Sequence, residues 1–142
     1  MKKASWILLT VLGGAIVLFS LVSAVHAYWS SDDYPIGGVR VSRVAGGDAG
    51  VESALRGIRG TSAAYGAAFG VLFLAIVLGP YRRGEVWAWK ALLVAGLTQG
   101  VLVLLRIPFL GTQLGADPAM TTLSLLAVGL LLDIGRLKNP AR

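Results

Sequence analysis

The sequence predicts an all-α membrane protein, a bundle of four transmembrane helices, from three observations. The 142-residue chain is 56% hydrophobic and only 14% charged, whereas about a quarter of the residues of an ordinary soluble domain are charged. Four apolar segments approach the roughly 20 residues that a helix needs to cross a bilayer. Basic residues gather on alternate connections between these segments, as in proteins with a fixed orientation in a membrane. We therefore treat residues 1–142 as a single membrane domain.

The first predicted span, residues 4–27, carries no charged residue and follows Lys2 and Lys3. A secretory signal peptide is the alternative, because small residues precede Tyr28 and cleavage after Ala27 would fit the usual pattern. The apolar stretch is longer than the about 7 to 15 residues typical of such peptides. We therefore expect a retained helix, and the sequence leaves cleavage of residues 1–27 open.

Three further spans are predicted at residues 61–80, 86–106 and 118–135. No charged residue lies between Thr61 and Gly79, and Lys90 lies near the start of the third span, from where its amine can reach the membrane surface. The fourth span is shorter and holds Asp133 at its end, so it needs local thinning of the bilayer or help from its neighbours. Asp133 can pair with Arg136, three residues further on.

The distribution of charge predicts the orientation. If the N-terminus is cytoplasmic, the inner segments hold eight basic and two acidic residues, whereas the outer segments hold five of each. The inner charges are Lys2, Lys3, Arg82, Arg83, Lys90, Arg136, Lys138 and Arg142 against Glu85 and Asp133. Both termini are therefore expected in the cytoplasm, with outer loops at residues 28–60 and 107–117.

The stretch GPYRRGEVWAWK, residues 79–90, becomes the cytoplasmic turn between the second and third spans, with its centre at residues 81–85. We expect Pro80 to end one helix and Gly84 to let the chain reverse. Trp87 and Trp89 lie roughly 200° apart around a helix, so they cannot form one stacking platform for nucleic acid. The predicted membrane-interface anchors, which would also attract anionic lipids, are Trp6, Tyr81, Arg82, Arg83, Trp87, Trp89 and Lys90.

Residues 59–91, RGTSAAYGAAFGVLFLAIVLGPYRRGEVWAWKA, resemble a pattern in small, mostly uncharacterised bacterial membrane proteins of four helices, some grouped loosely with the DoxX-like families. The match covers under a third of the chain, and most of its motif is what any basic, aromatic inner turn needs. The resemblance implies a multi-pass protein of the bacterial cytoplasmic (inner) membrane. It implies no catalytic residues.

Two G-x-x-x-G pairs lie at equal distances from the inner turn. Gly70 and Gly66 precede Arg83 by 13 and 17 residues, and Gly96 and Gly100 follow it by 13 and 17. Small residues at this spacing let helix backbones approach closely, so we favour an antiparallel hairpin with Gly70 beside Gly96 and Gly66 beside Gly100. Alternatively, one pair faces a second protomer, or glycine is simply common in this chain.

The first outer loop, residues 28–60, is expected to be partly ordered. Residues 39–44, VRVSRV, alternate apolar and polar side chains, which predicts a short strand or half a hairpin. Asp48 can cap a helix that begins at about residue 49. Arg56 and Arg59 on this helix are expected to be interfacial anchors, with a site for an anionic ligand as the alternative.

Catalytic groups are scarce in this sequence. The chain has no cysteine and one histidine, His26, so thiolate chemistry and the usual zinc ligand sets are excluded. Paired carboxylates and a glycine-rich phosphate loop that opens a helix are absent as well. A shallow polar site that includes His26, Gln99 and Arg106 is possible on residue type, against the plainer interpretation that the charged members only reach for the membrane surface.

We therefore expect a non-catalytic integral membrane protein without a cofactor or metal. The first hypothesis is an accessory or scaffold subunit that packs on another membrane protein or on itself. The alternative is binding or transport of a lipid or other hydrophobic small molecule within the helix bundle, around Gln99, Thr98 and Thr10. Membrane lipids are partners in both cases, and nucleic acid is in neither.

Overall fold

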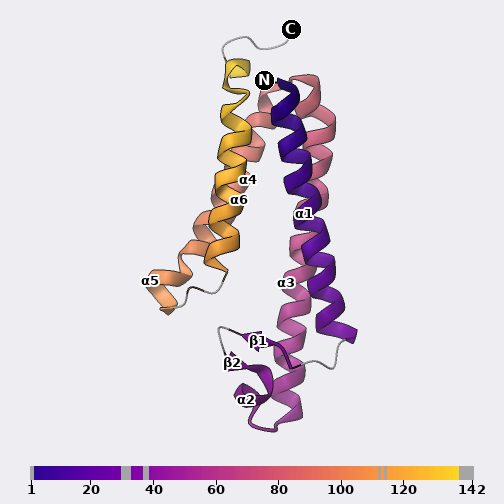
Figure 1. Ribbon diagram of the computed structural model, residues 1–142, viewed down its shortest axis with the longest axis vertical. Coiled ribbons are helices and arrows are strands. Elements are labelled where there is room, and N and C mark those ends of the chain that lie inside the picture. The colour runs from indigo at the N-terminus through magenta and orange to yellow at the C-terminus, as the bar shows by residue number, and fades with distance from the viewer. Residues whose placement is uncertain (1, 30–32, 37–38, 112, 114, 138–142) are drawn as a thin grey trace. The chain divides into compact units, whose positions relative to one another are not determined.

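The computed structural model describes residues 2–29, 33–36, 39–111, 113 and 115–137 (Figure 1). Although the sequence predicts one domain, the chain divides into two compact units. Unit 1 consists of Met1–Ala15 and Val71–Arg142, and unit 2 of Ile16–Gly70. The helices α1 (Lys2–Trp29) and α3 (Ala49–Ile76) each contribute to both units.

Helices account for most of the described chain. Besides α1 and α3, they are α2 (Val41–Ala45), the π-helical segment η1 (Val77–Tyr81), α4 (Val86–Leu104), α5 (Arg106–Leu110), α6 (Ala116–Leu131) and the 3-10 segment η2 (Ile134–Leu137). Two strands of two residues, β1 (Pro35–Ile36) and β2 (Val39–Arg40), pair in antiparallel fashion, with Pro35 opposite Arg40. The predicted helical class is therefore confirmed.

Three helical stretches are long and apolar enough to cross a membrane by length and composition: Lys3–Trp29, Ala49–Tyr81 and Val86–Leu110. The expected fourth span is the shorter apolar helix α6, which has 16 residues and a length of about 24 Å, less than the roughly 30 Å of a bilayer core. Large apolar side chains along these helices, such as Phe19, Leu72 and Leu102, are exposed. The chain thus has the surface and helix lengths of a membrane protein.

The helix predicted from about residue 49 and the predicted second span are one continuous helix. The Asp48 carboxylate caps its start, since Oδ1 accepts the N–H groups of Gly50 at 2.7 Å and Val51 at 3.1 Å, as the sequence predicts. Gly60 lies inside α3. A Cβ at this position would overlap the ring of Tyr28 on α1. This glycine permits close helix contact and makes no turn.

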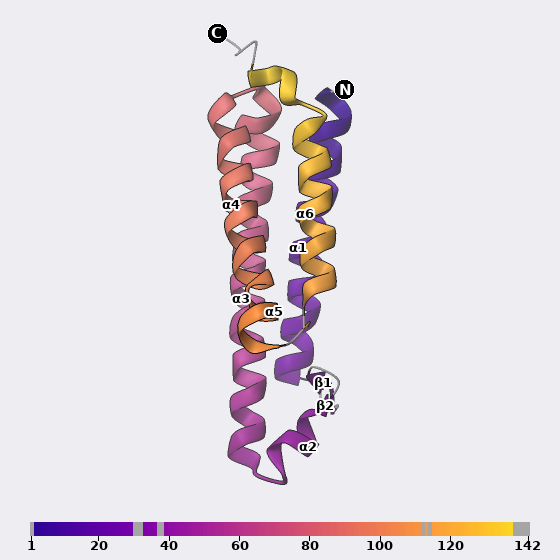
Figure 2. The same cartoon turned by 90° about the vertical axis from the view of Figure 1, so that its left-hand side faces the viewer.

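The prediction that Pro80 ends the second span is wrong. Pro80 lies inside η1, and helical structure continues to Arg83. A proline ring clashes with the carbonyl four residues earlier in a regular α-helix, and the wider π-helical turn relieves this clash. The reversal itself occurs at Gly84, whose φ of 97° lies in the region that favours glycine. Figure 2 shows α4 running back beside the end of α3.

The predicted strand over residues 39–44 is only partly correct, because just Val39–Arg40 form a strand and Val41–Ala45 form α2. Asp33 supplies the reason. Its Oδ1 accepts the backbone N–H of Ser42 at 2.9 Å, and its Oδ2 accepts the Ser42 hydroxyl at 2.6 Å. These bonds satisfy a free N–H in the first turn of a helix and hold the pKa of Asp33 below its ordinary value of 3.8.

In unit 2, the glycine pair of α3 packs against α1. A Cβ at Gly70 would lie 2.7 Å from Cγ2 of Val17, and one at Gly66 would lie 2.6 Å from the Ser20 hydroxyl oxygen. Both distances are shorter than real carbon contacts, so these positions require glycine at the present helix separation.

In unit 1, the glycine pair of α4 packs against α6. A Cβ at Gly96 would overlap Leu126, and one at Gly100 would lie 2.5 Å from both terminal carbons of Leu123. Within its own unit, each glycine pair therefore lies against a neighbouring helix, Gly66 and Gly70 against α1 and Gly96 and Gly100 against α6. The predicted seam between the two pairs would join the two units and stays a prediction. Equal depth along two helices does not specify which face of each helix turns toward the other.

The core of unit 1 contains a polar contact. The Ser5 side chain of α1 is fully buried, and its hydroxyl donates to the carbonyl of Gly129 on α6 at 2.6 Å. The hydroxyl oxygens of Ser5 and Tyr81 are 2.5 Å apart. Gly129 is in the last turn of α6, where helix carbonyls lack partners within the helix. Ser5 therefore caps the end of α6.

Candidate binding pocket between α4 and α6

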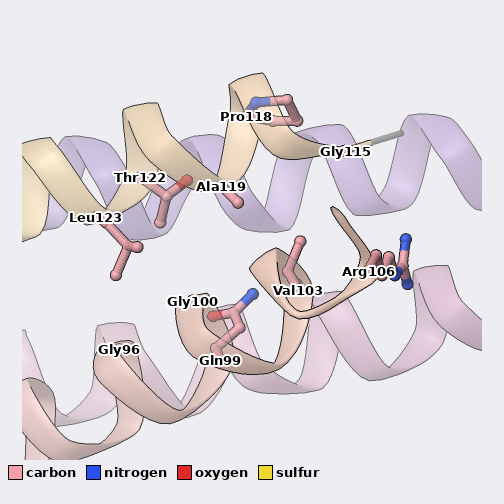
Figure 3. A pocket seen from close by; sticks show the side chains of 10 residues that line it. All are labelled: Gly96, Gln99, Gly100, Val103, Arg106, Gly115, Pro118, Ala119, Thr122 and Leu123. Carbon is pink, nitrogen blue, oxygen red and sulfur yellow. The ribbon is translucent and has the colours of Figure 1, made fainter. Parts of the chain in front are cut away.

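A pocket of about 270 Å³ lies between α4 and α6 in unit 1. Its wall on α4 includes Gly96 and Gly100, which have no side chains, and its wall on α6 includes the small residue Ala119 (Figure 3). The two helices lie side by side (Figure 1), so the space that missing side chains leave lies between them and is open on one side. Gly96 thus packs closely against Leu126 and Gly100 against Leu123, and the absence of side chains at both glycines also leaves the space of the pocket.

One end of the pocket forms where α4 gives way to α5. Pro108 has no N–H to donate to the carbonyl of Leu104, and α4 ends at that residue. Arg106, two residues after Leu104, begins α5 and lines the pocket. The opposite wall is the first turn of α6, where Gly115 adopts a φ of 77° and Pro118 occupies a position whose N–H would lack a helical partner.

Polar groups enter the pocket from both helices. Figure 3 shows the Gln99 amide extending from α4 toward α6, and the Thr122 side chain on α6 facing α4. Arg106 lies at the end nearest Gly115. The pocket therefore combines an apolar lining with a few convergent polar side chains, the composition that is typical of small-molecule sites.

Arg106 makes no hydrogen bond or ion pair with any residue for which the structure gives a position. Asp117, in the first turn of α6, is the acidic residue closest to it in the sequence, and the two form no ion pair. The Arg106 side chain is exposed. Its guanidinium is therefore available to an anionic group at this end of the pocket.

Of the three predicted polar-site residues, the structure brings together Gln99 and Arg106. His26 does not line the pocket. Its Nδ1 lies 2.9 Å from the carbonyl oxygen of Val22, four residues earlier on α1, and the contact is exposed. The spacing along α1 explains this bond, so His26 has a local role in the structure.

The predicted anchors in the turn after η1 are mostly exposed. Arg83, Arg82 and Lys90 are exposed, and the Arg83 guanidinium pairs with Glu85 at 2.9 Å. Glu85 also accepts the indole N–H of Trp87 at 2.5 Å. These two hydrogen bonds hold the pKa of Glu85 below its ordinary value of 4.5, and the bond from Arg83 has the larger effect. The basic groups therefore present charge at this turn, as the sequence predicts.

The two tryptophans of α4 face different surroundings, as their spacing predicts. Trp87 is 55% exposed, whereas the Trp89 indole donates to the Leu130 carbonyl of α6 at 3.1 Å. Trp6 is half-buried, with the Arg82 guanidinium 4.8 Å from its ring centroid. Trp89 thus caps the same end of α6 as Ser5 does.

Tyr81 differs from its prediction as an interface anchor, because it is fully buried. Its contact with Ser5, 76 residues away in the chain, was not predicted from the sequence. A serine early in an apolar helix and a tyrosine at an apolar boundary gave no signal that they meet.

Arg59 and Arg56, predicted as interfacial anchors, both make a cation–π contact within unit 2. The Arg59 guanidinium lies 4.1 Å from the ring centroid of Tyr34, and the Arg56 guanidinium lies 5.8 Å from it.

No group of three or more histidine, cysteine, aspartate or glutamate residues that could hold a metal occurs among the described residues. No family model matches the chain, no curated protein matches its sequence, and no solved structure matches it. The resemblance to DoxX-like proteins therefore stays a prediction, and the pocket is interpreted from its own geometry.

Proposed function

We propose that the protein is a non-catalytic integral membrane protein that binds a lipid or other hydrophobic small molecule between α4 and α6. The pocket carries this proposal, because it places Gln99, Thr122 and Arg106 around one apolar space. Gln99 and Arg106 were predicted as members of a polar site from the sequence, and both line this pocket. We give this hypothesis precedence over the accessory subunit for that reason.

The proposed setting is a bacterial cytoplasmic membrane, crossed four times, with both termini in the cytoplasm. The net positive charge of the connections on one side supports this orientation. In it, Arg106 and the first turn of α6 lie at the outer interface, and Gly96 lies deeper in the membrane. A reporter that is active only in the cytoplasm, fused after Arg142, is expected to be active. Activity of a reporter that works only in the periplasm would contradict the four-span topology.

An accessory or scaffold role is the second candidate, and Gly14 on α1 favours it. A Cβ at Gly14 would meet nothing within 4 Å, and the flanking residues Val11 and Leu18, one turn away on either side, are exposed. Small residues on an open apolar helix surface allow a second helix to approach closely. Such a surface suits another membrane protein or a second copy of the chain.

Purification in a mild detergent followed by native mass spectrometry separates the two candidates. The binding proposal predicts a chain or homodimer that carries one defined small molecule, and this molecule is lost when Ala119→Phe fills the pocket. Another protein at fixed stoichiometry, with no small molecule attached, would contradict it and favour the accessory role. A matched control is Ala127→Phe, since Ala127 is an exposed alanine on the same helix outside the pocket.

A further inference from the structure

We infer that the ligand of the α4–α6 pocket is an amphiphile with one apolar chain and an anionic head, and that Arg106 binds the head. This inference rests on the proposed binding function and adds the charge of the ligand, its orientation and the number of its chains. Three features of the pocket support it: the order of its polar groups, the Arg106 guanidinium, which has no ion-pair partner among the described residues, and the volume.

The polar groups follow the order that an amphiphile has along its length. Arg106 and Gly115 lie at one end of the pocket, and Gly96 and Leu123 lie toward the other (Figure 3). Gln99 on α4 lies seven residues before Arg106 and next to Gly100, and its amide faces the space between the helices (Figure 3). A charged head, a polar linkage and an apolar chain would meet a cation, an amide and an apolar wall in turn.

The head is anionic because Arg106 has no anion of its own among the residues whose positions are described. Its planar guanidinium can donate two parallel hydrogen bonds to a carboxylate or a phosphate. Both head groups therefore fit, and both occur on membrane amphiphiles. The attraction is stronger beside an apolar helix pair than in bulk water, because the local dielectric constant is lower.

The volume limits the ligand to one chain in the pocket. At about 270 Å³, the space falls just under the roughly 300–1,000 Å³ of sites that enclose a drug-sized molecule. At Gly96, one of the lining residues, Leu126 of α6 packs directly against the helix. A fatty acid or a single-chain phospholipid fits this limit, and a two-chain phospholipid could place only one of its chains there.

The test uses the full chain in phosphatidylcholine nanodiscs and two photoreactive probes, a diazirine fatty acid and its neutral glycerol ester. Crosslinking yield against probe concentration gives an apparent affinity, and peptide mapping gives the position. At a pH where the acid is ionised, we expect crosslinks on α4 and α6 and an affinity for the acid at least about tenfold higher than for the ester, the usual effect of a charge-assisted hydrogen bond.

Variants of Arg106 separate charge from fold. Arg106→Gln should abolish the preference for the acid, and Arg106→Lys should retain part of it, since the charge stays and the paired donors are lost. Arg43→Gln is the matched control, because Arg43 is an exposed arginine outside the pocket, and it should leave both affinities unchanged. Circular dichroism of each variant checks that the helices remain folded.

The outcomes distinguish this inference from the function on which it rests. Equal affinities for acid and ester, both lost in Ala119→Phe, would overturn the anionic head and leave the binding function standing. Crosslinks outside α4 and α6, or crosslinks that Ala119→Phe does not reduce, would overturn the binding function itself. Replacing part of the phosphatidylcholine by phosphatidylglycerol identifies the source: competition with the acid indicates a phospholipid, and its absence indicates a free fatty acid.

Discussion

Ser5→Ala tests whether a side chain of α1 caps the end of α6. The substitution removes the hydroxyl that donates to the Gly129 carbonyl at 2.6 Å and that lies 2.5 Å from the Tyr81 hydroxyl. Ser5 is fully buried, so water cannot replace the lost donor, and alanine fills nearly the same space. A buried carbonyl that loses its donor costs about 1–2 kcal/mol of unfolding free energy.

Two effects set this magnitude. Hydrogen bonds inside membrane proteins average roughly 0.6 kcal/mol each in double-mutant cycles, and two are lost here. Alanine recovers a few tenths of a kcal/mol through its higher helix propensity, whereas the desolvated carbonyl adds to the loss. We therefore expect a net destabilisation of about 1 kcal/mol or more, which lowers Tm by about 4 °C for a chain of this size.

Thermal unfolding of the purified protein in detergent, followed by tryptophan fluorescence, measures the effect. Ser62→Ala is the matched control, because the Ser62 hydroxyl donates to its own helix at the Ile58 carbonyl, 2.9 Å away, in an exposed position. Such bonds contribute little and slightly disfavour the helix. If Ser5→Ala and Ser62→Ala have the same Tm, the Ser5 hydroxyl does not stabilise the end of α6 and our interpretation of this contact is wrong.

Two further predictions concern the glycine packing and the segment that precedes α2. Gly96→Leu should lower the free energy of unfolding by about 1–3 kcal/mol in denaturant titrations, because its side chain would overlap Leu126. Gly57→Leu should leave stability unchanged or raise it by about 1 kcal/mol, since a Cβ at Gly57 meets nothing within 4 Å, and equal losses in both would contradict the packing. For Asp33, the lowered pKa means that its contribution to stability is present above pH 3.8 and is lost as the pH falls through the lowered value. Carboxyl NMR titration should show this shift. In Ser42→Ala the pKa should rise toward the ordinary value without reaching it, because the backbone N–H of residue 42 still donates to Asp33, and an unchanged pKa would contradict the role of the Ser42 hydroxyl.

The sequence by itself determined the features that depend on local chemistry. Long apolar segments predicted helices, the carboxylate of Asp48 predicted a helix start, and Gly84 predicted the reversal. The spacing of Trp87 and Trp89 predicted that they face different surroundings. Each of these follows from the geometry of a few consecutive residues, which neighbouring helices do not change.

Local patterns also misled where one signal has two meanings. Pro80 predicted a helix end but occupies a π-helical turn. The alternation of residues 39–44 predicted a strand, and the Asp33 side chain instead starts a helix at Val41. In each case a group distant in the sequence, or a different helix form, satisfies the backbone in a way that the local pattern does not encode.

Only the tertiary structure decided which surfaces meet. Gly96 and Gly100 pack on α6, because the rotation of α4 about its axis depends on all its contacts together. The same rotation turns Gln99 toward α6 and places Arg106 at the mouth of the pocket. Residue type identified these two polar groups, but a binding pocket requires the distance and orientation between two helices, and these arise only when the chain has packed.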